Sequence, residues 1–140
     1  MTTWAGSRTS VEFGPGQPLL LINDQLRVYD QQPHVLQALH DGDASALVEL
    51  AVEGAALGCQ GVDLLLDHPD LDETATLPLV LRAVDDALGC PIALDTRNRN
   101  AIERALEGYT GKPMLNSIVY ERPVLDDLLP LARQYNMVVI

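Results

Sequence analysis

The sequence predicts an α/β fold in which about five parallel strands alternate with helices. Short apolar runs bounded by Gly, Pro, Asn or Asp alternate with segments whose apolar residues recur at helical spacing. The chain is 47% hydrophobic but only 4% aromatic, which is typical of helices packed tightly on a buried parallel sheet. Such alternation implies right-handed crossovers, and two architectures fit it: an open doubly wound sheet or part of a closed barrel.

The first half of the chain contains two expected strands. Residues 1–17 are rich in Thr, Ser, Gly and Pro without a period, so we expect an irregular lead-in. The apolar run Pro18–Asn23 is a candidate strand, and weak helical character follows around Val35–Leu39. A helix that Asp43 can cap leads to Val62–Leu66, a continuous run typical of a fully buried strand.

The second half repeats the alternation of helix and strand three times. Each helix is marked by a side chain able to cap its first turn or by a proline, and each strand is a short apolar run. In order, the expected elements are a helix capped by Thr76 with Pro78 in its first turn, a strand at Pro91–Leu94, a helix begun at Asn98 or Asn100, a strand at Pro113–Leu115, a helix with Pro123 at its start and a kink at Pro130, and a strand at Met137–Ile140. Residues 18–140 are therefore expected to form one domain.

Charge and composition restrict the classes of partner. The 20 acidic residues outnumber the 9 basic ones, and the net charge of −11 repels nucleic acid and anionic membrane. The apolar runs are too short to cross a bilayer, and no signal peptide is evident, so we expect a cytoplasmic protein. The three histidines are scattered without metal-ligand spacing. A small molecule or another protein is the expected partner.

Polar side chains follow four of the expected strands, where a parallel barrel carries its working residues. They are Asn23 and Asp24, Asp67 and His68, Asp95, and Asn116 and Ser117. A carboxylate such as Asp95 can accept two parallel N–H bonds from an aminopyrimidinone edge, and an amide such as Asn116 can donate and accept on the next edge. These groups suit a flat heterocycle, and no nucleophile–base pair accompanies them.

Two segments resemble the methyltetrahydrofolate methyltransferase family. The sequence LDTRN, followed by AIE and AL over residues 94–106, is similar to the family segment LDS-x-N-x-x-AIEAGL. The sequence GKPMLNSI at residues 111–118 is similar to the family strand GK-x-M-I-N-S-I, and LLPLA at residues 128–132 matches as well. The same pattern occurs in the folate domain of cobalamin-dependent methionine synthase. The resemblance covers about residues 18–140.

This resemblance implies the amino-terminal half of a (β/α)8 TIM barrel of the dihydropteroate-synthase-like kind. In the family, the residues at the positions of Asp95 and Asn116 hydrogen-bond the pterin ring. Ser117 and Asn98 adjoin them and are expected to support the site. Asp24 stands near the position where the family's first strand carries the Glu of its GERIN sequence.

The function implied is binding of 5-methyltetrahydrofolate and transfer of its N5 methyl group to a corrinoid, cobalamin, carried by a separate corrinoid protein. The family's later half supplies another pterin-binding Asp and an Asn near N5. We therefore expect methyltransferase activity where that half is supplied, and no catalytic residue is assigned in this chain.

Two alternatives remain open. One is pterin condensation, as in dihydropteroate synthase, although the Asn-Ser pair after the fourth strand favours the methyltransferase branch. The other is a non-catalytic folate-binding or assembly subunit, which the end of the second strand favours. The family has D-x-N-x-G there, whereas this chain has Leu66 at the Asp position and His68 at the Asn position. Asp67 is expected to replace the acid only through a one-residue shift that turns it to the other face of the strand.

The last expected strand, Met137–Ile140, would present an apolar edge able to pair with another chain. We therefore expect either a longer gene product that carries the rest of the barrel or two copies that close one together. A homodimer is the expected oligomer.

Overall fold

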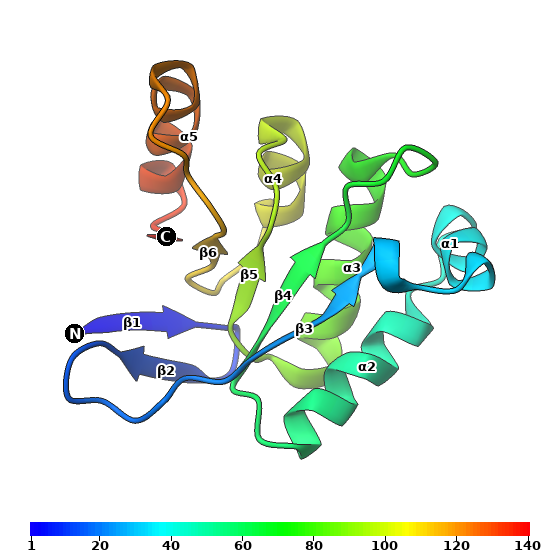
Figure 1. Ribbon diagram of the computed structural model, residues 1–140, viewed down its shortest axis with the longest axis horizontal. Coiled ribbons are helices and arrows are strands. Elements are labelled where there is room, and N and C mark those ends of the chain that lie inside the picture. The colour runs from blue at the N-terminus through cyan, green and yellow to red at the C-terminus, as the bar shows by residue number, and fades with distance from the viewer.

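The computed structural model describes all 140 residues, and its centre is a five-stranded parallel sheet. The strands are β3 (Ile22–Arg27), β4 (Gly61–Leu65), β5 (Ile92–Leu94), β6 (Met114–Leu115) and β7 (Val138–Val139), and they lie side by side in the order of the chain (Figure 1). A doubly wound sheet would reverse its strand order at a switch point. Here the order never reverses, so the sheet is compatible with half of a (β/α)8 barrel.

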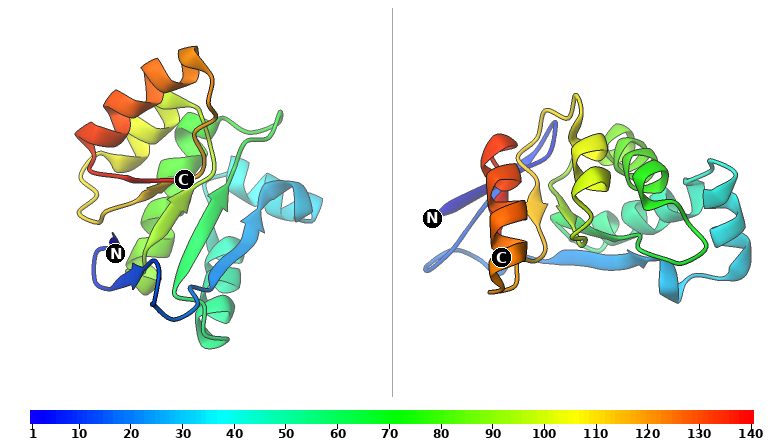
Figure 2. Two further views of the ribbon diagram at one scale, coloured as in Figure 1. Left: turned by 60° about the vertical axis from the view of Figure 1, so that its left-hand side comes forward. Right: turned by 90° about the horizontal axis from the view of Figure 1, so that it is seen from above.

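Helices cover one face of this sheet. They are α1 (Pro33–His40), α2 (Ser45–Ala56), α3 (Glu73–Leu88), α4 (Arg99–Leu106) and α5 (Arg122–Gln134), with a 3-10 turn at Val28–Asp30. Each of α2, α3 and α4 packs against the next helix in the chain (Figure 2). Alternate residues of the strands, such as Leu64 and Leu94, join the apolar stripes of the helices in one core of 25 buried residues. We call the opposite face of the sheet, which these helices do not cover, the inner face.

A β-hairpin closes the amino-terminal end of that inner face. Contrary to the irregular lead-in expected for residues 1–17, β1 (Thr2–Ala5) pairs antiparallel with β2 (Ser10–Phe13). Trp4 is completely buried there, and its Nε1 donates to the carbonyl oxygen of Ile92 at 3.2 Å. A Cβ at Gly61 would lie 2.4 Å from the Trp4 ring, so only glycine leaves room for it.

Two element boundaries differ from the sequence-based expectation. The first sheet strand runs over Ile22–Arg27 instead of Pro18–Asn23, so Asp24 lies within a strand and not at its end. Helix α3 begins at Glu73 because Asp72 caps it: the Asp72 side chain accepts from the backbone N–H of Thr74 at 3.0 Å. Thr76 and Pro78 therefore lie inside that helix.

Two other helix signals in the sequence are confirmed. Asn98 caps α4 by accepting from the backbone N–H of Ala101 at 3.2 Å, and Pro130 lies inside α5. Asp43 is not the N-cap expected for α2, because Ala44 takes that position; the Asp43 side chain accepts instead from the backbone N–H of Ser45, the first residue of the helix, at 2.9 Å. No helix has the length and apolar character needed to cross a membrane.

Candidate functional site

Two adjoining cavities lie on the inner face and at the carboxyl ends of the strands. We call the one at the strand ends the mouth cavity; it has a volume of about 550 Å³ and a mainly polar lining that includes Asp67, Glu73 and Asn98. The floor cavity lies deeper on the inner face, measures about 360 Å³, and is lined in part by Asp24, Arg27 and Asp63. Asp95 and Asn116 line both cavities, so they connect the two.

The residues predicted for the site therefore come together. Asp95, Asn98, Asn116 and Ser117 all line the mouth cavity, and Asp24 lines the floor cavity. Backbone hydrogen bonds place the strand ends: Asp95 N–H donates to the Leu64 carbonyl oxygen, and Asn116 N–H donates to that of Leu94, each at 2.9 Å. The side-chain oxygen of Asn98 is occupied by the helix cap, so its amide nitrogen remains available for a ligand.

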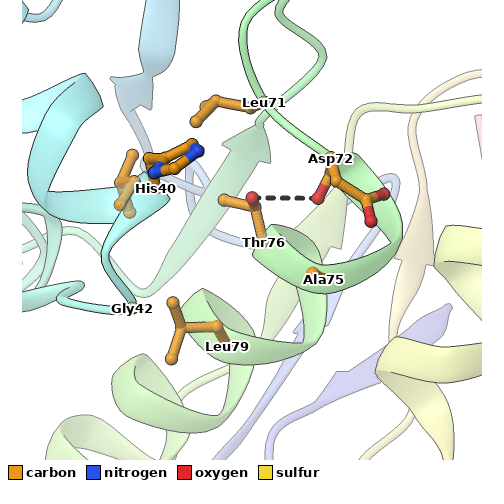
Figure 3. A pocket seen from close by; sticks show the side chains of 8 residues that line it. His40, Gly42, Leu71, Asp72, Ala75, Thr76 and Leu79 are labelled. Atoms are coloured by element: carbon orange, nitrogen blue, oxygen red, sulfur yellow. Dashed lines mark hydrogen bonds between the residues drawn. The ribbon is translucent and has the colours of Figure 1, made fainter.

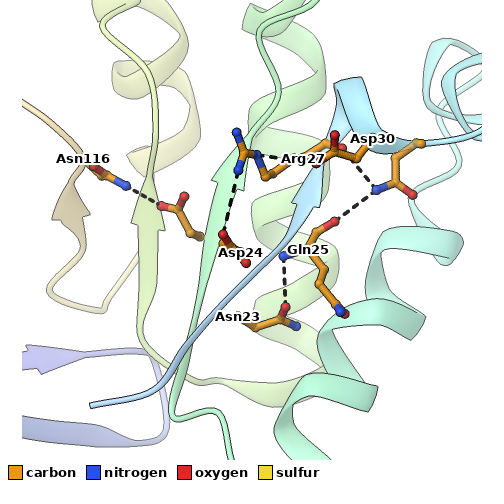
Figure 4. A network of polar contacts seen from close by, with 8 residues as sticks. Asn23, Asp24, Gln25, Arg27, Asp30 and Asn116 are labelled. Atoms are coloured by element: carbon orange, nitrogen blue, oxygen red, sulfur yellow. Dashed lines mark hydrogen bonds and ion pairs between the residues drawn. The ribbon is translucent and has the colours of Figure 1, made fainter. Parts of the chain in front are cut away.

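A bulge in β3 brings Asp24 and Arg27 to the same face. Asn23 pairs with Val62 and Leu26 pairs with Leu64, so β3 has one more residue than β4 over this stretch. The Asn23 amide holds the bulge, since its nitrogen donates to the Leu50 carbonyl oxygen at 2.9 Å and its oxygen accepts from the Gln25 N–H at 3.1 Å. Figure 4 shows the bond between Asn23 and Gln25 and the ion pair of Arg27 with Asp24.

Asp63 belongs to the site although the sequence reasoning missed it. It lies in the middle of β4, is only 7% exposed, and accepts a hydrogen bond from Asn116 Nδ2 at 3.1 Å (Figure 4). Burial raises the pKa of Asp63 to about 6; the hydrogen bond from Asn116 lowers it, and the charges of Asp95 and Asp24 raise it. The available signal was a single acid inside an otherwise apolar run, at a position that faces the inner side of the sheet.

The charges on the inner face are mostly negative. Burial raises the pKa of Asp95, while the positive charges of Arg27 and Arg97 lower it. Arg27 is half-exposed and lies 3.8 Å from the Asp24 carboxylate and 3.6 Å from that of Asp30. Carboxylate and amide oxygens that converge on a polar cavity suit a ligand that presents N–H donors.

The end of the second sheet strand differs from the expectation for Asp67. Leu66 is fully buried in the core between sheet and helices, whereas Asp67 is exposed and lines the mouth cavity together with Leu65. The chain leaves the sheet after Leu65, so Asp67 reaches the cavity without a shift in register. His68 turns away: its Nδ1 lies 3.9 Å from an Asp70 oxygen, and its ring lies 4.9 Å from that of Tyr29.

A further cavity of about 370 Å³ lies outside the sheet interior, between the end of α1 and the start of α3. Figure 3 shows its lining, which includes Leu71, Leu79 and Thr76, and the hydrogen bond of 3.0 Å that Thr76 donates to the Asp72 carbonyl oxygen. It contains none of the predicted site residues. The chemistry of the sheet interior is therefore the better guide to function.

Comparison with known proteins adds no assignment to this geometry. A scan against protein-family models finds no match, and a search of curated proteins finds none either.

Proposed function

We propose that the chain binds a reduced folate, 5-methyltetrahydrofolate, and takes part in transfer of its N5 methyl group to a corrinoid carried by a partner protein. One observation carries the proposal: Asp95 and Asn116, from neighbouring strands, line the same polar cavity. These are the two positions where the sequence resembles the pterin-binding segments of the methyltransferases.

The hydrogen-bonding groups fit the ring of a reduced pterin. The Asp95 carboxylate can accept from the ring N–H and the adjacent amino group in parallel, and the carboxamides of Asn98 and Asn116 offer a neighbouring set of partners. Asp95, Asn98 and Asn116 are partly withdrawn from water, so a ligand that lacks the donors leaves their oxygens unpaired. The feature that defines the proposed substrate class is therefore the pattern of N–H donors around its flat ring.

The chain's part in methyl transfer is positioning. A tertiary amine is a poor leaving group, so N5 must receive a proton or hydrogen bond as the methyl departs, and the methyl must point in line at its acceptor. The corrinoid, when bound, supplies the metal centre that accepts the methyl. Asp95 and Asn116 hold the ring, and the second half of the barrel is required to complete the surroundings of N5.

A non-catalytic folate-binding subunit is the second candidate. The observation that favours it is the second strand end, where Leu66 is buried in the core and His68 faces Asp70. Neither can supply the Asp and Asn that the methyltransferases carry there. Asp67 supplies one carboxylate to the mouth cavity. The two candidates therefore differ in whether this single acid is sufficient for methyl transfer.

Calorimetric titration with 5-methyltetrahydrofolate tests binding. We expect Asp95→Ala to weaken binding by about 10- to 100-fold, the loss expected for charge-assisted hydrogen bonds. Glu49→Ala is the control, because Glu49 is an exposed residue of α2 that lines neither cavity. Equal affinity of the wild-type and Asp95→Ala proteins would show that Asp95 does not bind the ligand and would rule out the proposed site.

Methyl transfer to cob(I)alamin, followed by its absorbance, separates the two candidate functions. Turnover that is lost in Asp95→Ala and kept in Glu49→Ala supports the methyltransferase. Tight binding without turnover, with the second barrel half present, favours the non-catalytic subunit.

A further inference from the structure

We propose that Asp63 is a positioning residue that holds the Asn116 amide with its oxygen toward the ligand, so that the site selects a ring edge made of N–H donors. The inference rests on the proposed function for the identity of the ring. The orientation of the amide concerns only the chain's own residues.

The contact joins two strands that are not neighbours. Asp63 comes from β4 and Asn116 follows β6, with β5 between them, and the hydrogen bond between Asn116 Nδ2 and Asp63 Oδ1 measures 3.1 Å. The Asn116 backbone is held separately by its bond to the Leu94 carbonyl oxygen. Asp63 is nearly buried, so its carboxylate has little water to bind instead. Figure 4 shows the Asn116 amide pointing inward to this bond.

The chemistry of the two groups decides which end of the amide faces which partner. An ionised carboxylate only accepts hydrogen bonds, while a carboxamide donates from nitrogen and accepts at oxygen. The nitrogen of Asn116 must therefore face Asp63, which leaves Oδ1 free for another donor. No hydrogen bond within the chain uses that oxygen.

As a consequence, the edge of a bound ring meets hydrogen-bond acceptors from two residues of the site. The Asp95 carboxylate and the Asn116 oxygen both require donors. A reduced pterin presents a ring N–H and the adjacent amino group as a pair of donors, and the N8–H lies further along the same side, beyond the acceptor nitrogen N1. A ring with a carbonyl in place of the amino group turns an acceptor toward these oxygens. A site built to bond such donors disfavours the analogue, because the partly buried acceptors of Asp95 and Asn116 would stay unpaired.

The amide orientation depends on the charge of Asp63. The groups that face Asp63 are Asp24 and Arg27 from β3, Asp95 directly after β5 and Asn116 directly after β6. Burial raises the pKa of Asp63 to about 6, so the carboxylate is ionised at pH 8 and mostly protonated at pH 5. A protonated Asp63 can donate to the amide oxygen, and Asn116 can then turn its nitrogen to the cavity. The selection for donors is therefore expected to hold above pH 6 and to relax below it.

The experiment follows the Asn116 side-chain amide by nitrogen-15 NMR in the ligand-free protein from pH 8 to pH 5. Its signals, assigned by their loss in Asn116→Ala, should titrate with a midpoint near pH 6 in the wild type and in Asp70→Asn, whose carboxyl is exposed and lines neither cavity. In Asp63→Asn they should not titrate. Signals that are independent of pH in the wild type, or that titrate equally in Asp63→Asn, overturn the proposal.

Binding of a tetrahydropterin and of the same ring with a carbonyl in place of its amino group gives the second readout. At pH 8 the wild type should prefer the tetrahydropterin by at least about tenfold, and Asp63→Asn should reduce that preference to about threefold or less. An unchanged preference in Asp63→Asn overturns the selective role. If the amide titrates as expected but no pterin binds, the proposed function fails while the positioning of Asn116 stands.

Discussion

Asp24, Asp63 and Asp95 share the inner face of the sheet with one half-exposed arginine, Arg27. Withdrawal of the two deeper carboxyls from water raises the pKa of Asp63 and of Asp95, and the Arg27 charge offsets only part of the effect. The fold thus keeps acids where they weaken it, which is common at binding sites because a ligand's donors can compensate for the lost water. Stability and ligand recognition oppose each other at these residues.

Asp63→Asn should stabilise the ligand-free protein at pH 7.5 by about 1–3 kcal/mol, because asparagine can keep the bond to Asn116 without a buried charge. The pKa of Asp63 is about 6 in the folded chain and ordinarily 3.8, so between these values the folded state binds more protons than the unfolded state. The loss of stability caused by the ionised Asp63 carboxyl is therefore absent below pH 4, grows as the pH rises, and reaches its full size above pH 6. Urea unfolding at pH 4 and pH 7.5 measures it.

Asp70→Asn serves as the control, since Asp70 is exposed and should change stability by less than about 0.5 kcal/mol at either pH. An equal effect of Asp63→Asn at the two pH values would show that the Asp63 carboxyl is not the group that titrates.

Among the elements, β3 and the amino-terminal hairpin do most to shape the site. The β3 bulge puts Asp24 and Arg27 on one face, although residues three apart in a regular strand face opposite ways. The hairpin seals the other end of the inner face with Trp4, which packs with Ala93, Met114 and Val138. One element therefore aims the polar groups, and the other closes the interior beneath them.

Gly54→Ala should disturb the β3 bulge from the neighbouring helix. Alanine favours a helix over glycine by about 1 kcal/mol, but a Cβ here would lie 2.1 Å from Asn23 Nδ2. Asn23 must then give up its bonds to Leu50 and Gln25, at a cost above that gain, so we expect a net loss of about 1–3 kcal/mol. Because Asn23→Ala removes the two closest contacts and leaves only the Cβ of residue 23 at 3.0 Å, the two substitutions should not be additive in urea unfolding. Additive losses would contradict this packing.

Trp4→Ala should lower the free energy of unfolding by about 3–5 kcal/mol, since the ring is fully buried and Nε1 bonds Ile92. Tyr120→Ala is the control: Tyr120 is 98% exposed and should change stability by less than about 0.5 kcal/mol. Guanidinium unfolding gives both values. A loss below about 1 kcal/mol in Trp4→Ala would mean that the hairpin docks only weakly on the sheet.

The alternation of elements could be predicted from sequence because buried parallel strands and capped helices leave strong local signals, as at Val62–Leu66 and Asn98. The hairpin could not, because its four-residue strands have no long period and Trp4 meets its partners only in the fold. The bulge depends on a long-range bond from Asn23 to Leu50. Asp63 was missed for a related reason: an acid within an apolar run shows no sign that its partner, Asn116, lies 53 residues away.

For the molecule as a whole, both edge strands of the parallel sheet are open. β3 and β7 each have a neighbour on one side only, and exposed apolar residues lie along or beside them: Leu21, Ile22, Val139 and Ile140. A closed barrel would pair both edges and enclose the inner face on which Asp95 and Asn116 lie. The proposed function therefore requires a further segment or a second copy that closes the sheet into a barrel.

The two open edges predict self-association of the chain. We expect the chain to form dimers through these edges, more strongly at high salt, because a net charge of −11 on each copy is repulsive and salt screens it. Val139→Lys places a charge on the β7 edge and should shift the protein to monomer in sedimentation velocity. Leu57→Lys is the matched control, because Leu57 is 83% exposed at the end of α2, away from both edges. A chain that stays monomeric at all salt and protein concentrations, or dimers that Val139→Lys and Leu57→Lys affect equally, would rule out association through this edge.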